Sequence, residues 1–341
     1  MLQTVLGEIE AKDVQMVLPH EHLYSDLRSA VAPLDNGIFY DKVALENLGE
    51  LLRNPYAVLD NALLPGLDVQ EKELLKMKNA GCNLLADVTT ADFGRDPLLL
   101  KETSQKTGVH IIAGCGSYID AYVSGKIKEQ SVEEMKKTII NDLTVGMDGT
   151  DIKAGVIGEI GSSMTTSETE YKYLQAAAEA QAETGFGMHI HACLWNDEGL
   201  RALKYAISKG ANPEKLCIDH ADVRLNEDYI LGVLNEGSYI EFDDYGKEFY
   251  VDRRNRNLLL NSFATDIERS RFIKKLIERG FGKQILVSTD VCLKSMLHTY
   301  GGWGYDHIFV NTIPMLEDVG LSAEDINMIT RENPIRFLER S

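Results

Sequence analysis

The stretch Val17-Leu-Pro-His-Glu-His-Leu23 joins a short apolar run to two alternating histidines, His20 and His22. Alternate residues of a β-strand share one face, so a strand here would direct both imidazoles to the same side. A His-x-His pair alone is weak evidence for a metal site. Its weight depends on the residues that end the later apolar runs.

Eight short apolar runs bounded by Gly, Asp or Asn recur along the chain and predict β-strands. They cover residues 16–22, 83–89, 110–116, 154–160, 187–191, 216–220, 239–242 and 285–290. Helical patterns lie between them at 69–80, 131–143, 168–184, 198–209, 229–236 and 270–279. This alternation favours the α/β class and a (β/α)8 TIM barrel, with a doubly wound open sheet as the alternative.

The sequence lacks the phosphate-binding signatures of nucleotide folds, because neither Gly-x-Gly-x-x-Gly nor a P-loop motif occurs. No repeat or Pro/Ser-rich linker divides the chain, so we predict one domain over residues 1–341. The long connection from Leu23 to about Leu67 is expected to hold an extra helix near 42–53 that contributes to the rim of the site.

Composition excludes several classes of function. A formal net charge of -18 without a Lys/Arg-rich stripe argues against a nucleic-acid or membrane partner. The first residues show no secretion signal, and no run approaches about 20 apolar residues. The five cysteines are scattered and never form Cys-x-x-Cys, which is typical of reduced thiols. We therefore expect a soluble, cytoplasmic protein that acts on a small molecule.

Polar residues end five of the predicted strands. In a parallel barrel the carboxyl ends of all strands meet at one face, so these side chains should surround one pocket. Each residue taken singly is more typical of a turn or helix cap, but six at one end of five strands are hard to explain that way. Four imidazoles and two carboxylates suit two divalent ions, zinc first and manganese or cobalt as alternatives. The six are His20, His22, Glu159, His191, His220 and Asp290.

Motifs along nearly the whole chain resemble the phosphotriesterase family of the amidohydrolase superfamily. They are Leu18-Pro-His-Glu-His-Leu23, Ala154-Gly-Val-Ile-Gly-Glu-Ile-Gly161, Ile190-His191, Asp219-His220-Ala-Asp222, Ser288-Thr-Asp290, Gly301-Gly-Trp-Gly-Tyr-Asp306 and Glu332-Asn-Pro-Ile-Arg-Phe337. The resemblance implies that His20, His22 and Asp290 bind the more buried metal. It also implies that His191 and His220 bind the more exposed one, and that Glu159 bridges both.

The sequence departs from the organophosphate-cleaving members of that family in two places. Those members bridge the metals with a carboxylated lysine, whereas Glu159 resembles the glutamate of the phosphotriesterase-related and phosphotriesterase homology proteins; Lys153 lies too early in its strand. After the seventh strand, the segment from Glu241 to Lys247 has neither the histidine nor the arginine of organophosphate hydrolases and lactonases. Efficient phosphotriester cleavage is therefore not expected.

The resemblance implies a binuclear-metal-dependent hydrolase that uses a metal-bridging hydroxide, with the metals polarising the scissile bond. Lactones or carboxylic esters, including phosphorylated sugar lactones, are the first expectation, with weak phosphotriesterase activity. An amidohydrolase for N-acyl amino acid-like substrates is one alternative. A non-catalytic binding protein on the same barrel is another. The resemblance also implies a possible homodimer, because homodimers are common in the family, although no stretch of the sequence identifies an interface.

Further residues receive roles as hypotheses. Asp290 is the candidate general acid/base. Tyr118, Lys247 and Asp222 are candidates for substrate contact, Asp222 alternatively relaying a proton or capping the next helix. His189 is either a functional residue or a hydrogen-bonded core residue, and the sequence favours the core residue. Arg253, Arg254 and Lys294 follow the last strands, where cations could bind a substrate phosphate or carboxylate. A solvated charged loop is the alternative interpretation of these residues.

Overall fold

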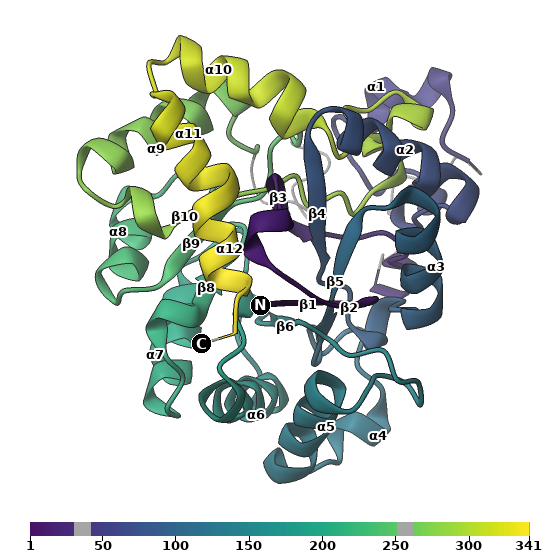
Figure 1. Cartoon of the computed structure of the whole chain (residues 1–341), viewed down its shortest axis with the longest axis vertical. Helices are drawn as coiled ribbons and strands as arrows, with labels where there is room; N and C mark the ends of the chain where they lie inside the picture. Colours follow the sequence, from purple (N-terminus) through teal and green to yellow (C-terminus); the bar gives the residue numbers. More distant parts are fainter. Residues whose placement is uncertain (31–41, 251–261, 341) are drawn as a thin grey trace.

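A computed structural model describes residues 1–30, 42–250 and 262–340 of the chain. Eight parallel strands pair in chain order and curl into a barrel with helices around it, so the predicted (β/α)8 TIM barrel is confirmed (Figure 1). The strands are β3 (Met16–Glu21), β4 (Cys82–Asp87), β5 (His110–Cys115), β6 (Val156–Gly161), β7 (Met188–His191), β8 (Leu216–Ile218), β9 (Tyr239–Phe242) and β10 (Ile285–Val287).

Helices lie at the six predicted places, as α2 (Leu67–Asn79), α5 (Val132–Thr144), α6 (Glu168–Thr184), α7 (Glu198–Ser208), α8 (Glu227–Asn235) and α9 (Asp266–Glu278). A further helix around the barrel, α3 (Pro97–Thr107), was not among the predicted ranges. Ser167 and Glu170 form a capping box at the start of α6, and Gly185 ends it at φ 74° in the left-handed region. The connection after β3 contains the short helix α1 (Leu48–Leu51) within the range expected for an extra helix.

Alternation along the strands divides each one between the barrel interior and the helix layer. In β8, Cys217 packs in a cluster with Leu2 and Phe337, whereas Leu216 and Ile218 belong to the larger cluster beneath the helices. Leu2 lies in the hairpin of β1 (Leu2–Thr4) and β2 (Gly7–Ile9). Phe337 lies in the last helix, α12 (Asn333–Leu338). The hairpin and α12 lie together at one end of the barrel (Figure 1). Their buried apolar side chains, Leu2 and Phe337 among them, form a floor for the barrel interior.

Side chains join the first and last barrel strands. The Ser288 hydroxyl accepts a hydrogen bond from His20 N at 3.2 Å and donates toward His20 O at 2.7 Å and Glu21 Oε1 at 2.8 Å. The buried Glu21 carboxylate also accepts from Thr289 N at 2.9 Å and from Val291 N at 2.8 Å. Glu21 thus fixes the segment that carries Asp290 against the strand that carries His20 and His22.

All five cysteines are free, without a disulfide partner. Within the described residues, no helix combines the length and apolar content that crossing a bilayer requires.

The junction between β3 and β10 yields a prediction about stability. Replacing Ser288 with alanine should lower the free energy of unfolding by about 1–3 kcal/mol, because buried polar groups on both strands lose their partner. Urea denaturation of S288A measures this loss. The control is S208A, which removes an exposed hydroxyl bond from Ser208 to Tyr205 O and should change stability by less than about 0.5 kcal/mol. Equal stability of the two variants would contradict the role of Ser288.

Candidate metal centre and pocket

The structure brings the six predicted ligands together at the carboxyl end of the barrel. His20 lies in β3 and His22 just after it, Glu159 lies in β6 and His191 in β7. His220 and Asp290 lie in the loops that follow β8 and β10. The side chains are buried, apart from His191, which is 15% exposed. Five different strands therefore supply one compact set of nitrogen and oxygen donors.

The deeper donors form a first group around His20 and His22. His22 Nε2 lies 3.1 Å from Asp290 Oδ1 and 3.5 Å from Glu159 Oε1. His20 Nε2 lies 3.8 Å from Asp290 Oδ1 and from Glu159 Oε2. Among the described residues, His20 Nε2 and Asp290 Oδ1 are buried without a hydrogen-bond partner. Buried polar atoms are rarely left unsatisfied, so this donor set fits a divalent cation.

A second group lies nearer the pocket. Glu159 Oε2 lies 2.9 Å from His191 Nδ1 and 3.4 Å from His220 Nε2. The two imidazole nitrogens are themselves 2.9 Å apart. Two lone pairs this close repel each other unless a proton or a cation lies between them. These donors therefore suit a second divalent cation, with Glu159 reaching both groups.

The remaining ring nitrogens of three histidines face acceptors away from the centre. His22 Nδ1 lies 2.8 Å from Thr89 Oγ1, and His220 Nδ1 lies 3.1 Å from Asp243 Oδ2. The third, His20 Nδ1, lies 3.3 Å from Glu241 Oε2. An Nδ1 proton held by such an acceptor leaves the Nε2 lone pair free for a metal.

The site concentrates negative charge in a dry environment. The site contains six buried carboxylates. Among the described residues, Lys247 is the only lysine or arginine that forms an ion pair with any of them, and its partners are Asp244 and Asp290. Burial raises the pKa of Glu159, but His191 and His220 more than offset this and hold it well below its ordinary value. Divalent cations would offset the remaining negative charge. The carboxylates are Glu159, Asp219, Glu241, Asp243, Asp244 and Asp290.

A pocket of roughly 610 Å³, partly open to solvent, lies above the donors. Its polar lining residues are His22, Glu159, His191, His220, Asp244, Lys247 and Asp290. The other lining residues, which we call the apolar wall, are Leu27, Pro55, Tyr56, Phe93, Tyr118, Leu194, Phe249, Phe263, Cys292 and Leu293. A cavity lined by many apolar side chains and a few polar groups is typical of a site for a small molecule.

The predicted substrate residues lie in different places. Tyr118 lines the pocket with its hydroxyl 3.3 Å from His191 Nδ1. Lys247 also lines it and forms ion pairs with Asp290 and, at 2.9 Å, with Asp244 Oδ1. Asp222 does not line the pocket as described.

Asp222 is buried 2.8 Å from Arg269 Nε and accepts a hydrogen bond from Asp244 N, so its role toward substrate stays a prediction. Lys294 lies outside the pocket lining, with its ammonium 2.5 Å from Asp60 Oδ1. Arg253 and Arg254 lie outside the described residues.

Sequence reasoning missed several carboxylates of the site. Asp219 and Glu241 lie on the interior side of β8 and β9, two residues away from the alternating apolar positions Cys217 and Tyr239. Alternation within the predicted strands was the available signal. For Asp243 and Asp244, which follow β9, the run Glu241-Phe-Asp-Asp was visible, but no spacing indicated their partners.

Residues 1–338 match the phosphotriesterase family over almost the entire chain. The chain belongs to this family. An N-acetyltaurine hydrolase of Danio rerio is 34% identical over 342 residues, which cover 99% of this chain and 97% of the relative. A resiniferatoxin-binding protein from Rhodobacter sphaeroides has a TM-score of 0.95 at 29% identity, with 99% and 94% of the chains covered.

A second solved structure is the phosphotriesterase homology protein from Escherichia coli, complexed with phosphate in its active site. It has a TM-score of 0.79 at 26% identity and covers 95% of this chain and 99% of its own. Phosphotriesterase-family hydrolases depend on a binuclear metal centre, and the two donor groups around Glu159 provide clusters for it in this chain. When bound, such ions activate water and polarise the bond to be cleaved.

The ligand set predicts a specific loss of metal. Zinc- or manganese-loaded protein should retain two ions per chain after desalting, and His22→Ala should retain at most one because a donor of the deeper group is lost. Elemental analysis with circular dichroism measures metal content and fold together. His110→Ala is the control, because His110 begins β5 at the opposite end of the barrel. Two ions retained by H22A would rule out this ligand.

Proposed function

We propose that this protein is a metal-dependent amidohydrolase that cleaves the acyl group from small N-acylated amines carrying an acidic group. The observation that carries the proposal is whole-chain similarity to N-acetyltaurine hydrolases together with a lysine beside the candidate metal ligands. N-acetyltaurine contains an amide bond and a sulfonate. A carboxylate or a sulfonate is the acidic group that a buried lysine would recognise.

Asp290 is the residue proposed to move the proton. Its Oδ1 faces the donors of the deeper group, while Oδ2 pairs with Lys247. Burial raises the pKa of Asp290, but Lys247 and the neighbouring histidines lower it by more than burial raises it. The carboxylate therefore stays ionised and able to accept a proton. Amide cleavage needs a proton acceptor during attack and a donor to the leaving nitrogen, and one positioned carboxylate can serve both steps in turn.

Lys247 is the proposed anchor for the acidic group of the substrate. Of the three N–H donors of its ammonium, one bonds Asp290 Oδ2, and Asp244 Oδ1 lies 2.9 Å from Nζ as an ion-pair partner that can face a second. Burial alone would lower the pKa of Lys247, but Asp244 and Asp290 raise it well above its ordinary value, so the side chain carries its charge at neutral pH. The third N–H is then available for a hydrogen bond to an anion in the pocket.

The apolar wall of the pocket is the proposed site for the acyl group. Phe93 and Tyr118 pack with their ring centroids 4.6 Å apart, and Phe249 and Phe263 form a second pair at 5.3 Å. Burying a short acyl chain here would contribute roughly 0.8 kcal/mol per methylene. An acetyl group or a slightly longer acyl chain that packs on the apolar wall, with the acidic group of the substrate at Lys247, is consistent with these lining residues.

A substrate panel tests the proposal against the sequence-based expectation of lactones or carboxylic esters. Metal-loaded protein should hydrolyse N-acetyltaurine or N-acetyl amino acids with higher kcat/KM than sugar lactones, their phosphorylated forms or paraoxon-like triesters. Release of amine and of acid is followed directly. Preference for a lactone would return the protein to the ester-cleaving interpretation. Absence of turnover across the panel would favour the binding-protein alternative.

Lys247→Met tests the anion anchor. We expect kcat/KM for an acidic N-acetyl compound to fall by about 10–100-fold, because a charge-assisted hydrogen bond contributes about 1.5–3 kcal/mol. The neutral analogue N-acetylethylamine should lose much less, and K294M is the matched control because Lys294 lies outside the pocket lining. Equal losses for both substrates would assign Lys247 to holding Asp290 rather than to binding substrate.

A further inference from the structure

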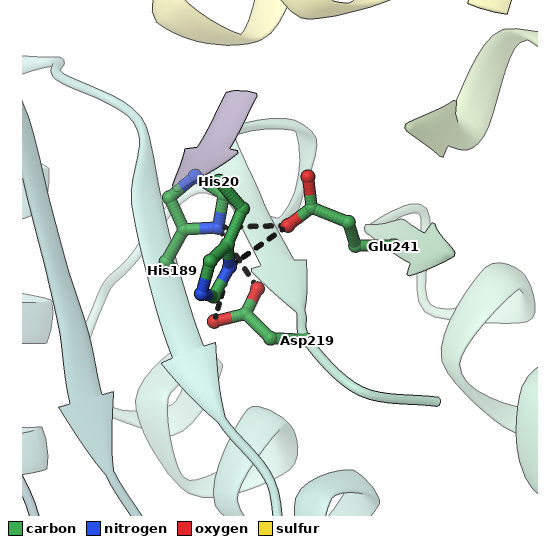
Figure 2. Close-up of side chains that lie close together, drawn as sticks. All are labelled: His20, His189, Asp219 and Glu241. Atoms are coloured by element: carbon green, nitrogen blue, oxygen red, sulfur yellow. Dashed lines mark hydrogen bonds and ion pairs between the residues drawn. The ribbon is translucent and has the colours of Figure 1, made fainter. Parts of the chain in front are cut away.

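Beneath the candidate metal centre lies a second set of polar side chains that forms no part of the predicted ligand set. His189 of β7, Asp219 after β8 and Glu241 of β9 point toward His20, as Figure 2 shows. All four are fully buried. We call His189, Asp219 and Glu241 the support layer. It lies between the apolar floor of the barrel and the metal ligands.

Contacts within the support layer alternate between imidazoles and carboxylates. His189 Nδ1 lies 2.8 Å from Asp219 Oδ1 and 3.3 Å from Glu241 Oε2. His20 Nδ1 lies 3.3 Å from the same Glu241 oxygen and 3.7 Å from Asp219 Oδ2. Each ring therefore lies close to both carboxylates (Figure 2). The His189 and His20 rings themselves meet edge to face, with their centroids 5.3 Å apart.

These contacts decide which nitrogen of His20 faces the metal site. Ionised carboxylates only accept hydrogen bonds, so His20 Nδ1 carries a proton and donates it. The opposite nitrogen, Nε2, is buried without a hydrogen-bond partner and faces Glu159 and Asp290. A ring held in this way presents its lone pair to a cation without having to change tautomer or rotate.

The support layer is costly for a barrel interior. Two carboxylates without water are expensive to bury, and apolar side chains of similar volume often stabilise a core more. Apolar packing begins immediately below, where the Phe337 ring lies 4.8 Å from the His189 ring. The metal centre therefore explains the charged side chains of the support layer better than the stability of the fold does.

We propose that Asp219, Glu241 and His189 are positioning residues that hold His20 for the deeper metal ion. Glu241 accepts the hydrogen bond from His20 Nδ1–H, and Asp219 faces the same nitrogen at 3.7 Å as an ion-pair partner. His189 holds these two carboxylates in place. This inference rests on the binuclear centre and not on the proposed substrate. Its failure and the failure of the amidase proposal are therefore distinguishable.

Metal affinity, measured without any substrate, tests the inference. Equilibrium dialysis against buffered free zinc gives the affinity of each of the two ions for the whole chain. Glu241→Leu should weaken the ion held by His20 by about 10–100-fold, the usual effect of removing an outer partner of a ligand, and leave the other ion unchanged. Glu241→Gln retains a hydrogen-bond acceptor and should recover most of the affinity.

The control is Glu170→Gln, which alters a fully buried carboxylate that caps α6 through Ser167. It should change stability without changing metal affinity. Because leucine at position 241 can prevent folding, Asp219→Asn is measured in parallel and should weaken the same ion to a smaller degree.

Unchanged affinities in E241L, or in D219N if E241L does not fold, would overturn the inference. Equal weakening of both ions in E241L and E241Q, in proportion to lost thermal stability, would assign the layer a purely structural role and overturn it as well. The four donors also lie within 4.8 Å of one another, close enough to hold an ion themselves. A third zinc in the parent chain that E241L loses would replace the positioning role with a metal site.

Discussion

The cost of burying carboxylates next to imidazoles inside a dry barrel is the constraint on which the rest of this structure depends. Desolvation opposes every one of these charges, and only hydrogen bonds, ion pairs or bound cations offset it. The chain meets this constraint by arranging its apolar and polar side chains in separate layers along the barrel axis. Leu2 and Phe337 close the floor with apolar side chains, the support layer lies above them, and the predicted metal ligands lie above that layer. Each level limits the freedom of the one above it.

Closure of the barrel and alignment of the ligands depend on the same interaction. Glu21 lies between His20 and His22, and its carboxylate bonds the backbone on both sides of Asp290, at Thr289 N and Val291 N. A shift between β3 and β10 would therefore move two histidines relative to the carboxylate of the last strand. The requirement for a precise metal site thus explains why a charged residue joins these strands where an apolar contact would suffice for folding.

The sequence predicted the elements governed by local periodicity. The eight strand ranges and the six convergent ligands follow from alternation and from the common direction of parallel strands, both of which are visible in one chain. Pairings made through long side chains were not predictable. The Lys247 pair with Asp290 crosses 43 positions and the Arg269 pair with Asp222 crosses two strand–helix connections, and neither spacing recurs as a motif. His189 lies one layer below His191 and is hydrogen-bonded, as alternation predicted, but its place in the support layer was not visible in the sequence.

Substrate choice must reside where these constraints are weakest. A protein named for resiniferatoxin binding retains almost the same fold at 29% identity, and N-acetyltaurine hydrolases match the chain from end to end. The buried residues of the two donor groups cannot change without leaving buried charges unpaired, whereas Phe249, Phe263 and Leu293 come from loops beyond the strands. Lys247 belongs to both sets, because it lines the pocket and neutralises Asp290. A change at this one position alters the pocket and the charge balance of the centre together, which makes it a stronger discriminator of chemistry than any residue of the apolar wall.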